Sequence, residues 1–207
     1  MISARVNRWL LGPFTKPVIL LLGFTPALWL GYAAVVNQLG ANPAEALIRA
    51  SGDWALRLLC LTLAVTPLRI SLRLPALARL RRILGLYVYF YACLHLLCYA
   101  GFDMGLELTD IARDLAKRPF ILVGFVALVL LTPLAATSWN GAIRRMGARR
   151  WQALHRWVYL IAPLAVLHFF WMRSAKHNLA EVQVYGAVIG VLLVWRLWRA
   201  RQTFVRA

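Results

Sequence analysis

The chain has 207 residues, 62% of them hydrophobic, and a mean hydropathy of +0.67. A soluble globular domain has about 45–50% apolar residues even when Gly is counted, so composition argues against a soluble protein. The net charge of +17 does not indicate nucleic-acid binding, because the charges fall in short clusters between long apolar runs. This pattern is typical of polytopic membrane proteins with Lys/Arg-rich cytoplasmic loops, which sit among membrane lipids.

Six apolar runs predict six membrane-spanning helices, since a span needs about 20 mostly apolar residues. We expect the spans at 17–36, 54–69, 83–101, 119–136, 153–171 and 182–198. The second is short and carries Arg57. No linker, low-complexity tract or internal repeat stands out. The sequence therefore predicts an all-α fold, a six-helix transmembrane bundle that forms a single domain over residues 1–207.

The Lys and Arg residues predict the orientation of this bundle. Alternating the spans places 17 of the 24 Lys and Arg on the side of both termini, and it places all seven acidic residues on the other side. The positive-inside rule then makes both termini cytoplasmic. Orientation alone explains the arginine clusters, although a surface of this kind also attracts anionic partners.

Three histidines lie within the predicted spans: His95, His155 and His168. Ionisable residues in a span are costly and usually face the bundle interior or a cofactor. At a rise of 1.5 Å per residue, His95 lies about 18 Å and His168 about 22 Å from the cytoplasmic edge, whereas His155 lies only ~3 Å in. We therefore expect His95 and His168 to share a level in the outer half of the membrane.

Two imidazoles at one depth on different helices can hold a planar iron porphyrin between them. Such a six-coordinate site favours electron transfer over oxygen chemistry. Zinc held by Cys93, Cys98 and His95 is the weaker alternative, because the two cysteines diverge by about 140° on a helix. A single intramembrane histidine would more often be a hydrogen bond between helices.

His155 has no histidine partner at its depth, where Arg81 and Arg82 stand. In an ideal helix His155 and His168 diverge by about 140°, although Pro163 between them can kink the segment. Two stacked bis-histidine haems are therefore not predicted. His177, beside Lys176, is expected to be a solvated loop residue.

The chain resembles a known family over nearly its whole length. The strings that carry the resemblance are weak singly but specific in their order and spacing: Thr66-Pro67-Leu68, Arg81-Arg82-Ile83-Leu84-Gly85-Leu86, Tyr91-Ala92-Cys93-Leu94-His95, Arg118-Pro119, Thr137-Ser138, Trp151-Gln152-Ala153-Leu154-His155, Val158-Tyr159, and His168 with Trp171. They resemble the haem-binding membrane subunits of bacterial protein-methionine-sulfoxide reductase systems, the MsrQ family (formerly YedZ) of the ferric-reductase-like transmembrane superfamily. The functional histidines of that family match His95, His155 and His168.

The resemblance implies a multi-pass protein of the bacterial inner (cytoplasmic) membrane that carries haem b, and it also implies FMN. It implies electron transfer from a cytoplasmic flavin reductase or the quinone pool to MsrP, a periplasmic molybdenum-containing methionine sulfoxide reductase that repairs oxidised envelope proteins. In this interpretation the chain is an electron-transfer subunit with no catalytic side chain of its own, and the partner reduces the substrate. His95 and His168 would be the axial ligands of the haem iron, and His155 would serve an inner haem or flavin site.

Two other classes of protein remain open. A proton or small-solute carrier that uses histidine as a relay would also explain intramembrane histidines. Against a carrier, the sequence shows no acidic residue in mid-membrane and no pair of broken helices. A purely structural subunit explains the bundle but leaves the matched depths of His95 and His168 to chance.

Overall fold

The computed structural model describes residues 2–174 and 179–205, and within them it is helical, with no strand. The predicted loop residues Lys176 and His177 lie outside the described residues. The elements in chain order are α1 (Ile2–Leu11), α2 (Thr15–Val35), α3 (Pro43–Ser71), the 3-10 turn η1 (Pro75–Arg79), α4 (Leu80–Cys98), the π turn η2 (Tyr99–Asp103), α5 (Leu108–Lys117), α6 (Pro119–Ala136), α7 (Asn140–Met146), α8 (Ala148–His155), α9 (Val158–Ser174) and α10 (Ala180–Val205).

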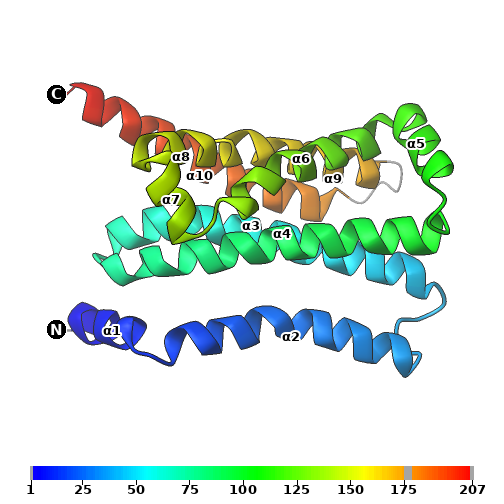
Figure 1. Ribbon diagram of the computed structural model, residues 1–207, viewed down its shortest axis with the longest axis horizontal. Helices are drawn as coiled ribbons and strands as arrows, with labels where there is room; N and C mark the ends of the chain where they lie inside the picture. Colours follow the sequence, from blue (N-terminus) through cyan, green and yellow to red (C-terminus); the bar gives the residue numbers. More distant parts are fainter. Residues whose placement is uncertain (1, 175–178, 206–207) are drawn as a thin grey trace.

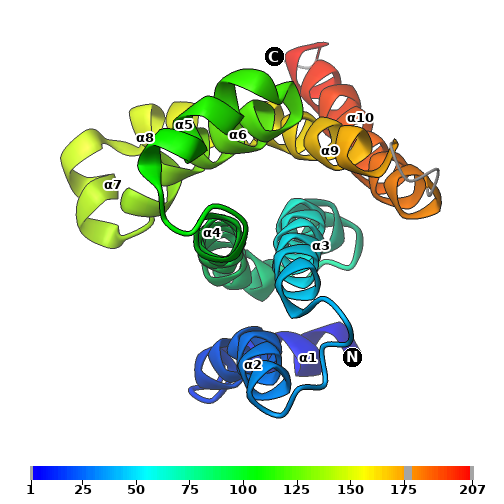
Figure 2. The same cartoon turned by 90° about the vertical axis from the view of Figure 1, so that its right-hand side faces the viewer.

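Six segments of this structure are long and apolar enough to cross a membrane, which confirms the predicted all-α, six-span class. The long helices run side by side (Figure 1), with both chain ends, α7 and α8 at one end of the bundle and α5 at the other. We call these the terminal end and the α5 end. Viewed along the helices, α3 and α4 form a layer between α2 on one side and α6, α9 and α10 on the other (Figure 2).

The second and fifth predicted spans differ most from the helices in the structure. The second span is much longer than 54–69, because α3 begins at Pro43. Its start is built locally: Asn42 Oδ1 accepts a hydrogen bond from Glu45 N at 3.1 Å, and Pro43 occupies the first turn, where its missing N–H costs nothing. Glu45 and Arg49 form a 2.5 Å ion pair on the same helix. Two of the charges that shortened the prediction, those of Glu45 and Arg49, are thus paired within the helix.

The fifth predicted span is interrupted. The segment 153–171 is not a single straight helix, because α8 ends at His155 and α9 begins only at Val158. The divergence of about 140° expected for His155 and His168 holds for one ideal helix and therefore does not apply to this segment. The two residues belong to separate helices joined by a turn at Arg156 and Trp157.

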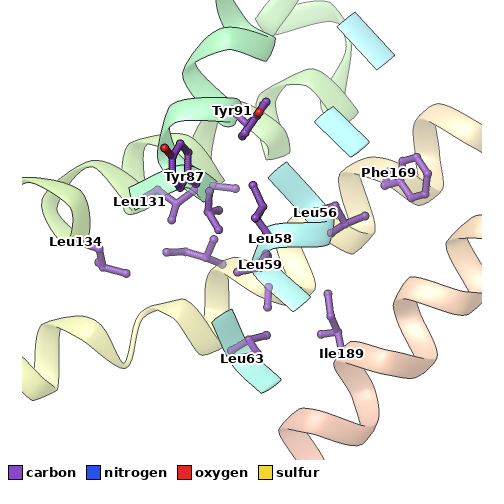
Figure 3. Packing of buried hydrophobic residues seen from close by; sticks show 14 of the residues in the cluster. Leu56, Leu58, Leu59, Leu63, Tyr87, Tyr91, Leu131, Leu134, Phe169 and Ile189 are labelled. Atoms are coloured by element: carbon purple, nitrogen blue, oxygen red, sulfur yellow. The ribbon is translucent and has the colours of Figure 1, made fainter. Parts of the chain in front are cut away.

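The core of the bundle is a cluster of apolar residues from α3, α4, α6, α9 and α10 (Figure 3). Leu63, Tyr91 and Ile161 are at most 1% exposed. By contrast, Leu21 and Leu22 on α2 are 70% and 65% exposed. An apolar helix that shows large apolar side chains outward fits a lipid environment, because its backbone groups are satisfied internally.

Two tyrosines of α4 attach α2 to the rest of the bundle. Tyr91 Oη accepts a hydrogen bond from Ala27 N at 3.1 Å and donates one to Gly23 O at 2.8 Å. The hydroxyl thus stands between two groups that would bond each other in a regular helix. Tyr87 Oη donates to Leu20 O, and its ring lies so close to Gly23 that a Cβ there would come within 2.3 Å of it. A glycine is therefore required where α2 meets α4.

Candidate functional site

His95 on α4 and His168 on α9 face each other in the bundle. Their ring centroids lie 6.1 Å apart, and their planes make an angle of 80°. The structure thus brings together, from neighbouring layers, the two histidines for which the sequence predicts a shared level.

The hydrogen bonds of these imidazoles define which nitrogen carries the proton. His95 Nδ1 lies 2.8 Å from Ile48 O, and His168 Nδ1 lies 2.6 Å from Phe120 O. A backbone carbonyl only accepts, so Nδ1 of each ring donates and each Nε2 keeps a lone pair. A second ring nitrogen that donates to a carbonyl is the usual arrangement in metal-binding histidines, because it fixes both tautomer and orientation.

A glycine stands behind each imidazole. A Cβ built on Gly52 would lie 3.1 Å from His95 Nδ1, and one built on Gly124 would lie 2.8 Å from both Nδ1 and Cε1 of His168. Gly52 follows Ile48 by four residues, one turn along α3, and Gly124 follows Phe120 by the same four along α6. Sequence reasoning missed both glycines.

The arrangement fits a haem with two axial histidines. An imidazole nitrogen lies ~2 Å from a bound transition metal, so two axial rings on one iron have centroids about 6 Å apart. As whole residues, His95 and His168 are half-buried, whereas Tyr91, one turn away from His95 on α4, is 0% exposed.

Cys93 and Cys98 are free thiols, and the described residues contain no group of three His, Cys, Asp or Glu side chains arranged to hold a metal ion. The zinc alternative considered for the sequence therefore has no ligand cluster in this part of the chain. An axial pair on one porphyrin needs only two imidazoles, and His95 and His168 lie at the ring separation that such a pair requires.

His155 has different surroundings from the other two histidines. Its Nε2 lies 3.0 Å from Thr137 Oγ1, and its ring stacks on Trp151 with centroids 3.9 Å apart. The Thr137 hydroxyl also lies 2.7 Å from Pro133 O, so it donates there and accepts from His155. The Nε2 of this histidine is thus occupied, in contrast to those of His95 and His168. Arg81 and Arg82 act electrostatically on the same ring.

A network of charged side chains lies between α3, α9 and α10, toward the α5 end. Arg173 is 8% exposed and forms a 2.7 Å ion pair with Glu181. Arg57 Nε donates to Tyr185 Oη at 3.1 Å, and Asp53 lies within electrostatic reach of Arg57, Arg173 and Glu181. Asp53 follows Gly52, which contacts the His95 ring. Asp53 lies within the second span as the structure has it, because α3 begins eleven residues earlier than predicted.

The terminal end of the bundle is rich in arginine. Arg196 Nη2 donates to Leu63 O at 2.9 Å, a carbonyl without its usual helical partner because the residue four positions later is Pro67. Arg196 also repels Arg81. All seven acidic side chains belong to the α5 end or to the halves of spans nearest to it. The terminal end therefore presents cations without neighbouring carboxylate side chains.

Comparisons with known proteins agree on one kind of relative. Residues 51–166 match the family described as "Ferric reductase like transmembrane component". The "Protein-methionine-sulfoxide reductase heme-binding subunit MsrQ" of Polaromonas naphthalenivorans (strain CJ2) is 64% identical over 192 residues, which cover 93% of this chain and 88% of the relative. The protein of the same name from Caulobacter vibrioides (strain ATCC 19089 / CIP 103742 / CB 15) is 45% identical over 180 residues, covering 87% of this chain and 85% of the relative. No solved structure matches the chain.

Proposed function

Because the chain belongs to the MsrQ family of heme-binding subunits of protein-methionine-sulfoxide reductases, we propose that it conducts electrons across the bacterial inner membrane through a haem b held by His95 and His168. The observation that carries this proposal is the opposed pair of imidazoles, 6.1 Å apart, each with Nδ1 bonded to a backbone carbonyl. The bound haem supplies one-electron redox chemistry. The protein holds the two imidazoles in the neutral tautomer that can ligate iron.

The resemblance of the sequence to the MsrQ family supports electron flow from the cytoplasm to the periplasm. We propose that both termini are cytoplasmic and that the α5 end faces the periplasm, as the distribution of Lys and Arg predicts. The acceptor is then the periplasmic, molybdenum-containing reductase MsrP, which reduces oxidised methionine in envelope proteins. The chain itself contributes no catalytic side chain to that reduction. Its donor is a cytoplasmic flavin reductase or the quinone pool.

An inner carrier near His155 would shorten the path from the terminal end to the haem. The stacked Trp151–His155 pair beside Arg81 and Arg82 supports FMN there, because FMN is flat and carries a phosphate. A second haem is the alternative, and the hydrogen bond from Nε2 to Thr137 weighs against it. We therefore propose that His155 contacts the inner carrier and does not ligate iron.

A reduced-minus-oxidised visible spectrum of the purified protein tests the haem proposal. We expect a low-spin b-type signal that is lost in His95→Ala and in His168→Ala, with membrane insertion unchanged because apolar spans drive insertion. His155→Ala is the matched control and keeps the signal. Normal low-spin haem content in either His95→Ala or His168→Ala would refute the proposal that these two histidines ligate the haem iron. A wild-type protein without haem would instead favour the proton or small-solute carrier, for which the charged network around Asp53 would be the relay.

The role of His155 is tested by the source of electrons. In His155→Ala we expect the haem to be reduced by dithionite but no longer by the cytoplasmic donor. Gln152→Ala, an exposed change on the same helix α8, serves as the control. Donor-driven reduction at the wild-type rate in His155→Ala would show that His155 is structural and that electrons enter elsewhere.

A further inference from the structure

The imidazoles of His95 and His168 are held by two seats of the same construction. In each seat, a carbonyl accepts the Nδ1 hydrogen bond, and a glycine one turn later on the same helix leaves room for the ring. Ile48 and Gly52 of α3 form the seat for His95, and Phe120 and Gly124 of α6 form the seat for His168. We call them the α3 seat and the α6 seat.

The two seats are spaced almost identically along the chain. The carbonyl residue precedes its histidine by 47 residues in the first case and by 48 in the second. In both, the seat lies on a helix that begins at the α5 end, and the histidine lies on a helix that returns to that end (Figure 1). The two seats therefore have the same construction and nearly the same spacing, although no repeat stands out in the sequence. Each glycine precedes its histidine, by 43 residues in the first case and by 44 in the second.

We propose that Gly52 and Gly124 are positioning residues that set the rotation of the axial imidazoles and so the near-perpendicular angle between them. This inference rests on the proposed function, since it concerns ligands of the haem. Each ring is fixed on two sides, by the hydrogen bond at Nδ1 and by close contact with the glycine. Its plane is therefore set by its own pair of helices, α3 with α4 or α6 with α9. The 80° angle is the relation between two independently fixed rings.

An alanine in either seat would disturb this arrangement by a different amount. At Gly124 the added Cβ would overlap the His168 ring at 2.8 Å, so the ring must rotate or move and its bond to Phe120 O must lengthen. At Gly52 the closest approach is 3.1 Å, so a shift of a few tenths of an ångström is enough. The larger effect is expected for Gly124→Ala.

Other glycines in the spans provide matched controls, because they do not contact the histidines. A Cβ on Gly186 would meet a valine methyl group at 3.8 Å, an ordinary contact, and a Cβ on Gly190 would meet nothing within 4 Å. Both lie in α10, in the middle of a span. Gly186→Ala and Gly190→Ala therefore report any general cost of placing a methyl group in a transmembrane helix.

The experiment uses the full-length, haem-loaded protein purified in detergent. The electron paramagnetic resonance spectrum of low-spin iron reports the angle between the axial imidazole planes, because that angle sets the splitting of the two iron orbitals that overlap with the rings. Nδ1 hydrogen bonding tunes the midpoint potential. In Gly124→Ala we expect a less anisotropic low-spin signal and an oxidised-to-reduced ratio that changes about fivefold at fixed potential, the effect of one ordinary hydrogen bond. Gly52→Ala should change both in the same direction by less, and the controls should match wild type.

The outcomes separate this inference from the proposed function. If the wild-type protein shows no low-spin haem, the proposed function fails. If wild type shows it but Gly124→Ala and Gly52→Ala have the spectrum and potential of the α10 controls, the glycines are not positioning residues. If Gly124→Ala does not accumulate, the milder Gly52→Ala decides alone, and an unchanged spectrum in that variant overturns the proposal.

Discussion

Replacing Tyr91 by phenylalanine would test how the first span is held. Tyr91 is 0% exposed, and its hydroxyl joins α4 to Ala27 N and Gly23 O of α2. Tyr91→Phe keeps the ring but leaves these two backbone groups without their partner. Each buried group left unpaired costs about 1–3 kcal/mol, so the upper estimate is about 2–6 kcal/mol for both. If α2 relaxes so that Ala27 N bonds Gly23 O directly, the loss falls to about 1 kcal/mol.

The assay is reversible unfolding in mixed micelles with increasing denaturing detergent, with helix content as the signal. Tyr32→Phe is the control, because Tyr32 lies on α2 but is 55% exposed. We expect Tyr91→Phe to lower the free energy of unfolding by about 1–6 kcal/mol and Tyr32→Phe to change it by less than about 0.5 kcal/mol. Equal stability of Tyr91→Phe and wild type would refute the view that the inserted hydroxyl holds α2 on the bundle.

Two further predictions concern the ends of the bundle. Reporter fusions after Arg150 and at the C-terminus should read cytoplasmic, and a fusion near Asp110 should read periplasmic, as the Lys/Arg asymmetry predicts; a periplasmic reading at Arg150 would invert the orientation. The rate of electron input from the cytoplasmic donor should fall with salt, and fall further in Arg144→Ala with Arg145→Ala, because exposed charges steer encounter and are screened over ~8 Å at physiological ionic strength. An input rate independent of salt and of these arginines would leave orientation as their sole role.

The two ends of the bundle differ in how their charged side chains are compensated. Arg173 and Glu181 form an ion pair between α9 and α10, and Asp53 lies within electrostatic reach of both of them and of Arg57, which bonds Tyr185. The terminal end instead gathers arginines, and Arg196 there donates from its two terminal nitrogens to Tyr159 Oη and Leu63 O. Charge at the α5 end is thus compensated among side chains, whereas the terminal end keeps a positive surface.

The sequence alone determined the features that depend on local composition. Pro119 opens α6 and Ala136 closes it, at the residues predicted, because an unbroken apolar run bounded by charge and proline defines a span by itself. The same reasoning selected His95 and His168, since an ionisable group in an apolar run is costly wherever the helix packs. It failed for α3, whose charges find partners on its own and neighbouring helices, and for the turn that separates His155 from α9.

Only the tertiary structure decided how the two histidines are held. That Gly52 lies behind His95 and Gly124 behind His168 depends on which helices pack together and in what register, which no single segment encodes. The tautomer of each ring follows from a carbonyl 47 or 48 residues away, and the 80° angle follows from the packing of two separate helix pairs. The hydrophobicity of a span is a property of one continuous segment and can be read from the sequence. Hydrogen bonds and close contacts between helices join residues that are far apart in the sequence, and they exist only once the bundle has formed.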